Sequence, residues 1–201
     1  LDNRLSGLLS RATKAGDRWA MEFVPRLRGQ LLAGRDLSAR QVEILAKIEA
    51  RHSDKAQAVR DSWASSFTSE MRAKLVIAAR YYLANPPYFR DLAQTAIEDD
   101  SFVPTKRAYE KMVENKYATK VIESTLSKAK FAAGSHVALR ANAPARSVGY
   151  AVPRASTGLV LKADAKPVTS PARGSKVYSV LFFGQTTPNF VEERWLKKGK
   201  R

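Results

Sequence analysis

The stretch KVYSVLFF at residues 176–183 decides the fold of the second half of the chain. It is rich in β-branched and aromatic residues, which favour strands. Side chains alternate between the faces of a strand, so Tyr178, Val180 and Phe182 share one face and the intervening residues share the other. Similar runs, separated by Gly, Pro, Ser and Thr, occupy 136–140, 157–162 and 189–191. The pattern predicts a basic β domain over residues 132–201.

Upstream of residue 132, apolar residues recur with helical spacing. The run 69–83 is apolar on most sides, which predicts the central helix of a bundle. The stretch 105–130 predicts one long basic helix that ends a helical domain over residues 1–131. The chain is therefore predicted to be α+β, a helical bundle followed by a small β domain. The clearest i, i+4 ladder comprises Trp19, Phe23, Leu27 and Leu31.

The C-terminal segment resembles a known family of small barrels. An apolar strand after Gly134, a second entered through Gly158, the strand 178–182 and the acidic-then-apolar run 192–198 are similar to an SH3-like barrel of the KOW or Tudor kind. The resemblance implies a binding module without chemistry of its own, used on RNA, DNA or a protein tail. The connector 142–156 is longer than such barrels usually have.

The formal charge of +16 is concentrated in the second half of the chain. Residues 1–100 carry 16 Lys and Arg against 13 Asp and Glu, a net of +3, whereas residues 101–201 carry 19 against 6, a net of +13. A field of this sign attracts polyanions, and neutralised phosphates release counterions, which gives affinity independent of base sequence. The charge therefore predicts a DNA or RNA partner; solubility and an anionic membrane surface are the alternatives.

Candidate binding residues are cations at predicted strand ends, in loops, on the long helix and near the C-terminus. Such side chains can reach a phosphate backbone. Two aromatic residues beside loops are candidates for stacking on unpaired bases. The predicted nucleic-acid-binding residues are Lys116, Lys120, Arg140, Arg146, Arg154, Lys162, Lys166, Arg173, Lys176, Lys197 and Lys198, with Tyr150 and Trp195 for base stacking.

The sequence contains few groups that could carry out catalysis. It has no cysteine, which excludes disulfides and thiolate zinc sites, and its two histidines, His52 and His136, stand apart from any catalytic pattern. The acidic run Glu98-Asp99-Asp100 has no second acidic group near it, so we interpret it as a solvated turn. No phosphate-binding loop of the GxxxxGK[ST] type occurs. We expect no enzymatic activity, no metal and no cofactor.

These observations predict a non-enzymatic nucleic-acid-binding protein that acts as an accessory or recruitment factor in transcription or replication, with a phage origin as a further hypothesis. The near-neutral helical half is predicted to hold a protein partner. An alternative is a protein-interaction module whose basic barrel binds an acidic segment; a third is a metal-dependent nuclease using residues 98–100. Without cysteine or an apolar run of about 20 residues, an intracellular protein with no membrane span is expected.

Overall fold

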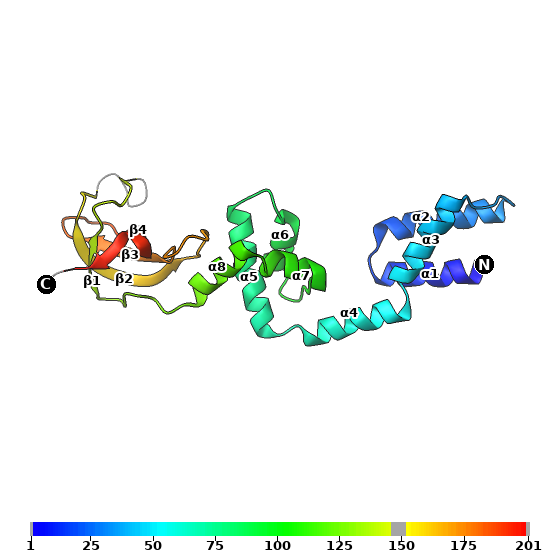
Figure 1. The fold of residues 1–201 in the computed structure, drawn as a ribbon, viewed down its shortest axis with the longest axis horizontal. Coiled ribbons are helices and arrows are strands. Elements are labelled where there is room, and N and C mark those ends of the chain that lie inside the picture. The colour runs from blue at the N-terminus through cyan, green and yellow to red at the C-terminus, as the bar shows by residue number, and fades with distance from the viewer. Residues whose placement is uncertain (1, 146–151, 200–201) are drawn as a thin grey trace. The chain divides into compact units, whose positions relative to one another are not determined.

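The computed structural model describes residues 2–145 and 152–199. The chain forms two compact units, residues 1–66 and residues 67–201. The described residues contain helices α1 to α8, followed by a five-stranded antiparallel sheet (Figure 1). The predicted α+β class, with helices first and a small β part at the C-terminal end, is confirmed. The predicted boundary at residue 131/132 separates helices from strands and lies inside the second unit.

The first unit contains α1 (Asp2–Lys14), α2 (Arg18–Leu32), α3 (Ala39–Arg51) and α4 (Asp54–Ser66). Ser38 and Gln41 form a capping box at the start of α3, as each side chain bonds to the backbone N–H of the other. The core of the unit comes from the first three helices. It comprises Leu5, Leu8, Ala12, Ala20, Val24, Leu27, Leu45 and Ile48.

The ladder predicted for the second helix is partly wrong. Trp19 is 50% exposed and stacks on Phe23, with 4.7 Å between ring centroids. The residues of α2 that are buried are Ala20, Val24 and Leu27, a stripe that begins one residue later. The small side chain of Ala20 suits close packing against a neighbouring helix better than an indole ring does.

The helical part of the second unit consists of α5 (Ser69–Ala84), α6 (Arg90–Glu98), α7 (Lys106–Val113) and α8 (Lys116–Leu126). Helix α5 packs against the other three and buries Leu75, Ala78, Ala79 and Tyr82, so the predicted central helix is confirmed.

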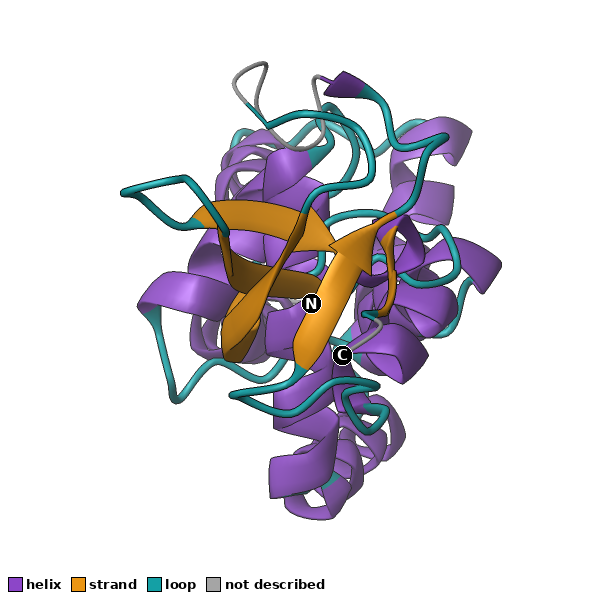
Figure 2. Cartoon of the chain, turned by 90° about the vertical axis from the view of Figure 1, so that its left-hand side faces the viewer, coloured by secondary structure: helices purple, strands orange, loops and turns teal. Residues whose placement is uncertain are grey.

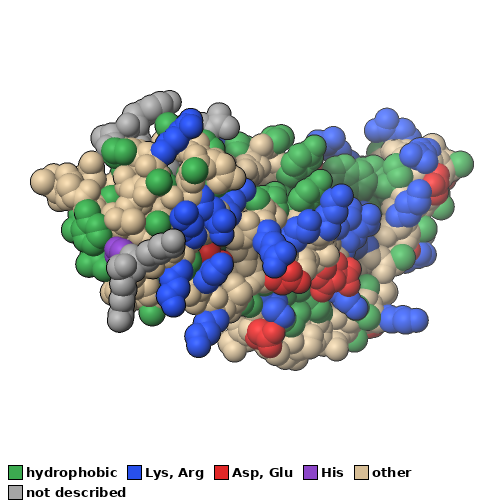
Figure 3. All heavy atoms as spheres, turned by 60° about the vertical axis from the view of Figure 1, so that its left-hand side comes forward, with side chains coloured by type: hydrophobic (Ala, Val, Ile, Leu, Met, Phe, Trp, Pro, Cys, Tyr) green, Lys and Arg blue, Asp and Glu red, His purple; other side chains and the backbone are tan. Residues whose placement is uncertain are grey.

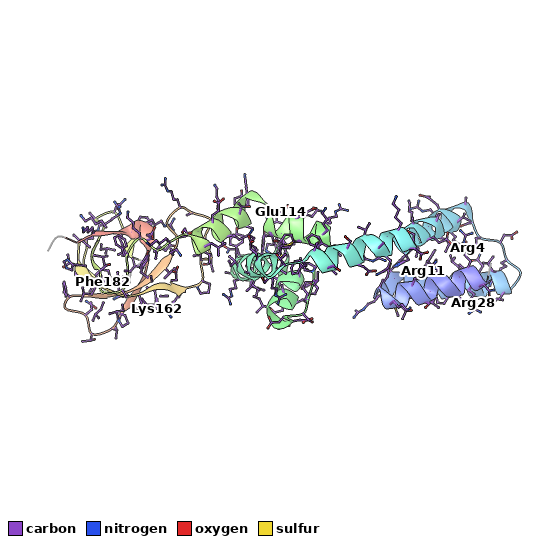
Figure 4. All side chains as sticks on the ribbon, turned by 90° about the horizontal axis from the view of Figure 1, so that it is seen from below. Arg4, Arg11, Arg28, Glu114, Lys162 and Phe182 are labelled. Atoms are coloured by element: carbon purple, nitrogen blue, oxygen red, sulfur yellow. The ribbon has the colours of Figure 1, made fainter. Side chains whose placement is uncertain are left out.

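The single long helix predicted over 105–130 is wrong, because the chain breaks between α7 and α8. Asn115 is the N-cap of α8 and its side-chain oxygen accepts the backbone N–H of Tyr117 and Ala118, 3.1 Å away in each case. This cap satisfies amides that would otherwise lack partners, so a new helix begins there. Glu114, which is labelled in Figure 4, is the C-cap of α7 and lies where the chain breaks before α8.

The sheet has the strand order β4-β3-β2-β1-β5, and all neighbouring strands are antiparallel (Figure 2). It is not a closed barrel, because within residues 2–145 and 152–199 the edge strands β4 and β5 do not pair with each other. The run 192–198 noted in the sequence contains the 3₁₀ helix η2 (Glu193–Trp195), followed directly by the last strand. The strands are β1 (His136–Leu139), β2 (Thr157–Lys166), β3 (Val177–Phe182), β4 (Asn189–Glu192) and β5 (Leu196–Lys198).

One face of this sheet forms a core of its own. Tyr178, Val180 and Phe182 are fully buried, as the alternation along β3 predicts (Figure 4 labels Phe182). Gly158 lies where β2 crosses β3, and a Cβ atom there would come within 2.3 Å of the Leu181 carbonyl oxygen. Only glycine permits this close approach. Register shifts along β2 after Val160 mark bulges, which bend and twist a strand.

Candidate nucleic-acid interface

A basic groove of about 640 Å³ lies along the part of the sheet formed by β1 and β5. Four of its lining side chains, Lys130, Arg140, Lys197 and Lys198, are cations that are all exposed. Among the described lining residues none is Asp or Glu. The other lining residues are Phe131, Gly134, Ser135, His136 and Gly199.

Pairing of β1 with β5 brings the two ends of the β part together at this basic groove. In the register, Ala138 lies opposite Lys197 and Val137 lies opposite Lys198. Arg140 directly follows β1, and its Nε donates to the Leu196 carbonyl at 3.1 Å. Because the Arg140 side chain is exposed, the remaining N–H groups of its guanidinium are accessible to a ligand.

The segment that carries Lys130 is fixed by a buried tyrosine. The Tyr178 hydroxyl accepts the backbone N–H of Lys130 at 2.8 Å and donates to Glu193 Oε2 at 2.6 Å. Burial, together with the hydrogen bond to the Glu193 carboxylate, raises the pKa of Tyr178 well above its usual range. The hydroxyl therefore stays protonated and keeps donating to Glu193 at neutral pH.

The acidic residues of the β part are engaged by neighbours inside it. Residues 128–201 contain 14 Lys and Arg but only Asp164, Glu192 and Glu193 as acids. Asp164 pairs with Lys176 at 2.6 Å, and Glu192 pairs with Arg194 at 2.5 Å. Glu193 is held by Tyr178. The exposed cations of the basic groove therefore keep their positive field. Figure 3 shows Lys and Arg side chains spread over the side of the molecule that it draws.

The predicted cations are distributed over more than one surface. Arg140, Lys197 and Lys198 line the basic groove. Lys120 and Arg173 line a second cleft of about 520 Å³ beside α8, whose wall also contains the carboxylates of Glu123 and Glu193. The exposed predicted residues that line neither cavity are Lys116, Arg154, Lys162 and Lys166. Arg146 and Tyr150 lie outside the described residues.

Lys176 does not belong to the exposed basic surface. It is 2% exposed, and its ammonium group donates to Asp164 and to the Thr125 carbonyl at 3.0 Å. A buried cation needs such partners because losing its water is costly. It joins the segment before β3 to β2 and to the end of α8, and although it also lines the second cleft, its ammonium group is already engaged by these two partners.

Trp195 is also a poor stacking platform. Its ring is partly buried and packs against the core of the sheet, and the Arg194 guanidinium lies 5.0 Å from its centroid. A base could not reach both ring faces. This corrects the expectation that Trp195 stands beside a loop with a free ring.

Lys130 and His136 line the basic groove but do not belong to the set predicted from sequence. Lys130 was assigned to a helix, but α8 ends at Leu126 and Lys130 lies in the connection to β1. His136 was interpreted as structural, whereas it lines the groove at the start of β1. The two lysines directly before Phe131, Lys128 and Lys130, were a signal in the sequence that would have pointed to Lys130.

The acidic run 98–100 forms a turn organised by an arginine. The Arg72 guanidinium donates to the carbonyls of Ala96, Asp99 and Phe102 and pairs with Asp100 at 3.2 Å. Asp99 accepts from the Ser101 hydroxyl and backbone, and these bonds lower its pKa. Across the described part of the chain, no three His, Cys, Asp or Glu residues form a group that could hold a metal ion.

No protein-family model matches the chain, and no curated protein matches it in sequence. Among the described residues, none of the helices has the length and apolar character needed to cross a membrane.

Proposed function

We propose that this protein binds nucleic acid without catalysing a reaction on it, and that the basic groove is its main phosphate-binding surface. The observation that carries the proposal is the set of four exposed cations that line one groove, whose described lining residues include no carboxylate. Lys and Arg side chains that converge in this way can neutralise several phosphates of one strand. Contacts of this type position a nucleic acid but do not read its base sequence.

The first unit supports an accessory or recruitment role in transcription or replication. It exposes several large apolar side chains, which are available to a protein partner. Trp19, Leu32, Val42 and Val59 are between 50% and 73% exposed.

Changing Trp19, Val42 and Val59 to Ser should leave the affinity for nucleic acid unchanged, as measured by fluorescence anisotropy. A tenfold loss would assign this surface to nucleic acid instead.

The basic groove can be tested by removing three of its charges while keeping the fold. Lys130, Lys197 and Lys198 are exposed, so changing all three to Gln should preserve the sheet. Arg140 is left in place because its Nε also bonds to the backbone of β5. Each lost phosphate contact should flatten the slope of log affinity against log salt by about 0.7 on a single strand or about 0.9 on a duplex. The variant should therefore lose roughly 2 to 3 units of slope.

A matched control removes the same charge from the first unit, by changing the exposed residues Lys14, Arg18 and Arg35 to Gln. This control should lose little affinity and keep its slope. The proposal is wrong if the chain binds neither single-stranded nor duplex nucleic acid at low salt. It is also wrong if the control variant loses as much affinity as the groove variant.

A further inference from the structure

The face of the sheet opposite its core exposes apolar and aromatic side chains. Along β3 the buried residues alternate with residues that point away from the core, and Phe183 continues this outward set. Phe183 is 59% exposed and Phe190 is 46% exposed. Leu159 and Leu161 on β2 are exposed by 39% and 47%. We call Phe183, Phe190, Leu159 and Leu161 the aromatic face.

A lysine ammonium group lies over the ring of Phe190. The Lys166 ammonium lies 3.7 Å from the ring centroid of Phe190, within the range of a cation–π contact. Lys162 belongs to the same cross-strand row, since it lies opposite Ser179 and Ser179 lies opposite Phe190. Figure 4 labels Lys162 on β2. An anionic ligand lying over the aromatic face would therefore meet positive charge along β2.

The aromatic face adjoins the basic groove through one residue. His136 lines the groove, and its ring lies 5.6 Å from the Phe183 ring with an angle of 36° between the planes. Across the sheet, His136 is also opposite Leu159. The ring packs close to Gly199, where a Cβ atom would come within 2.6 Å of His136 Nδ1. A strand whose phosphates lie in the groove would thus pass beside Phe183.

We propose that the aromatic face binds the unpaired bases of a single-stranded nucleic acid whose phosphates are held by the basic groove and by Lys162 and Lys166. This inference rests on the proposed function and adds the substrate class. Aromatic side chains stack on bases of any sequence, provided that the face of the base is free. The bases of a duplex are paired and stacked on one another, so a duplex can use only the phosphate contacts.

The spacing of the two phenylalanines suits more than one nucleotide. Phe190 pairs with Ser179, which is four residues before Phe183 along β3 and its extension. At about 3.3 Å per residue, the two rings are separated by roughly 13 Å along the strand. Bases at different positions of one oligonucleotide would stack on the two rings.

The test compares a twelve-nucleotide oligothymidylate with a duplex of the same length, using anisotropy across several salt concentrations. Changing Phe183 and Phe190 together to Leu keeps apolar area but removes the aromatic rings. Stacking is worth ~1–3 kcal/mol per base, so the double variant should bind the single strand at least tenfold more weakly. Its affinity for the duplex and its salt slope should not change, because the phosphate contacts remain.

Tyr117 provides a matched control. It is 50% exposed, and the Lys116 ammonium lies 5.0 Å from its ring, but it belongs to α8 and not to the sheet. Changing Tyr117 to Leu should leave the affinity for the single strand unchanged. An equal loss in this variant would overturn the assignment of stacking to the aromatic face.

The remaining outcomes separate this inference from the proposed function. Equal binding of single strand and duplex, or normal single-strand binding by the double variant, would overturn the inference and leave the proposed function standing. Absence of binding to both nucleic acids at low salt would overturn both. A twelve-residue polyglutamate that binds as tightly as the oligothymidylate, and loses affinity in the double variant, would identify an acidic protein segment as the ligand and overturn the inference.

Discussion

The first unit and the β part both carry many cations, but the two regions differ in how many of these cations have a carboxylate partner. Residues 1–66 contain 12 Lys and Arg against 8 Asp and Glu, and residues 128–201 contain 14 against 3. In the first unit several carboxylates pair with cations: Arg4 with Glu49, Arg40 and Lys47 with Glu43, and Arg51 with Asp17. In the β part the three acids are engaged within the fold, and the groove cations are left without them.

This difference shows that the number of positive charges is a poor guide to a binding surface. Exposed ion pairs contribute little stability, but they do cancel the local field that a polyanion would feel. The cations that remain without a carboxylate partner, and that converge on one groove, are the ones that mark an interface. Substitutions in the two regions should therefore differ in their effects on stability and on ligand binding.

The largest expected effect follows from Gly158→Ala. The added methyl group would clash with the backbone of Leu181 and Phe182, so β2 and β3 would have to move apart. We expect a loss of ~3 kcal/mol or more in the free energy of unfolding of the β part. Nucleic-acid binding should fall with it, while the helical signal in circular dichroism persists.

Gly29 is the control for this substitution. It lies inside α2, and a Cβ atom there would meet no atom within 4 Å beyond its own helix. Gly29→Ala should stabilise the first unit by roughly 0.5–1 kcal/mol, because alanine favours a helix more than glycine does. A Gly158→Ala protein as stable as the wild type in urea denaturation would contradict the close approach of β2 and β3.

A smaller loss in the free energy of unfolding is expected for the first unit at low pH. The hydrogen bond from His52 is the main reason that the pKa of Asp17 is lowered to about 2, and the N-terminal amide of α2 and Arg51 act in the same direction. A lowered pKa gives stability that is present above pH 4 and is lost as the pH falls toward 2. The size is on the order of 2 kcal/mol.

Urea denaturation of the full chain, followed by circular dichroism at pH 5, 4, 3 and 2, tests this expectation. Asp17→Asn should remove most of the loss between pH 4 and pH 2. The exposed Asp36 provides the comparison, and Asp36→Asn should retain the loss. If Asp17→Asn and the wild type lose stability in parallel, the Asp17 contacts do not stabilise the unit.

A third prediction contrasts two lysines of the β part. Lys176 is buried between Asp164 and the Thr125 carbonyl, so Lys176→Met should lower the free energy of unfolding by about 1–2 kcal/mol. Lys162 is exposed, so Lys162→Met should cost less than ~0.5 kcal/mol. Binding should show the opposite order, since Lys162 is exposed and the Lys176 ammonium group is already engaged. A flatter salt slope for Lys176→Met would place Lys176 in the interface after all.

The sequence predicts the parts of this fold that depend on local periodicity. Strand alternation places Tyr178, Val180 and Phe182 in the core, and the capping box places the start of α3. The same alternation puts Phe183 on the opposite face, although phenylalanines are usually buried. The aromatic face could thus have been recognised from strand alternation alone.

Other features depend on residues far apart in the chain. The burial of Lys176 requires Asp164 and Thr125, which are 12 and 51 residues away. Strand β5 has three residues, two of them lysines, and only its pairing with β1 makes it a strand. That pairing also brings Lys197 and Lys198 to the basic groove with Lys130, which no local pattern indicates.

The most direct test of the central claim is lysine footprinting of the unmodified full chain. The protein would be acetylated with and without an excess of the twelve-nucleotide oligothymidylate, and each lysine would be quantified by mass spectrometry. We expect at least fivefold protection of Lys130, Lys162, Lys166, Lys197 and Lys198, no protection of Lys14, Lys47 and Lys55, and slow modification of the buried Lys176 in both samples. Equal reactivity of the β-part lysines with and without the oligonucleotide, or protection confined to the first unit, would contradict the account.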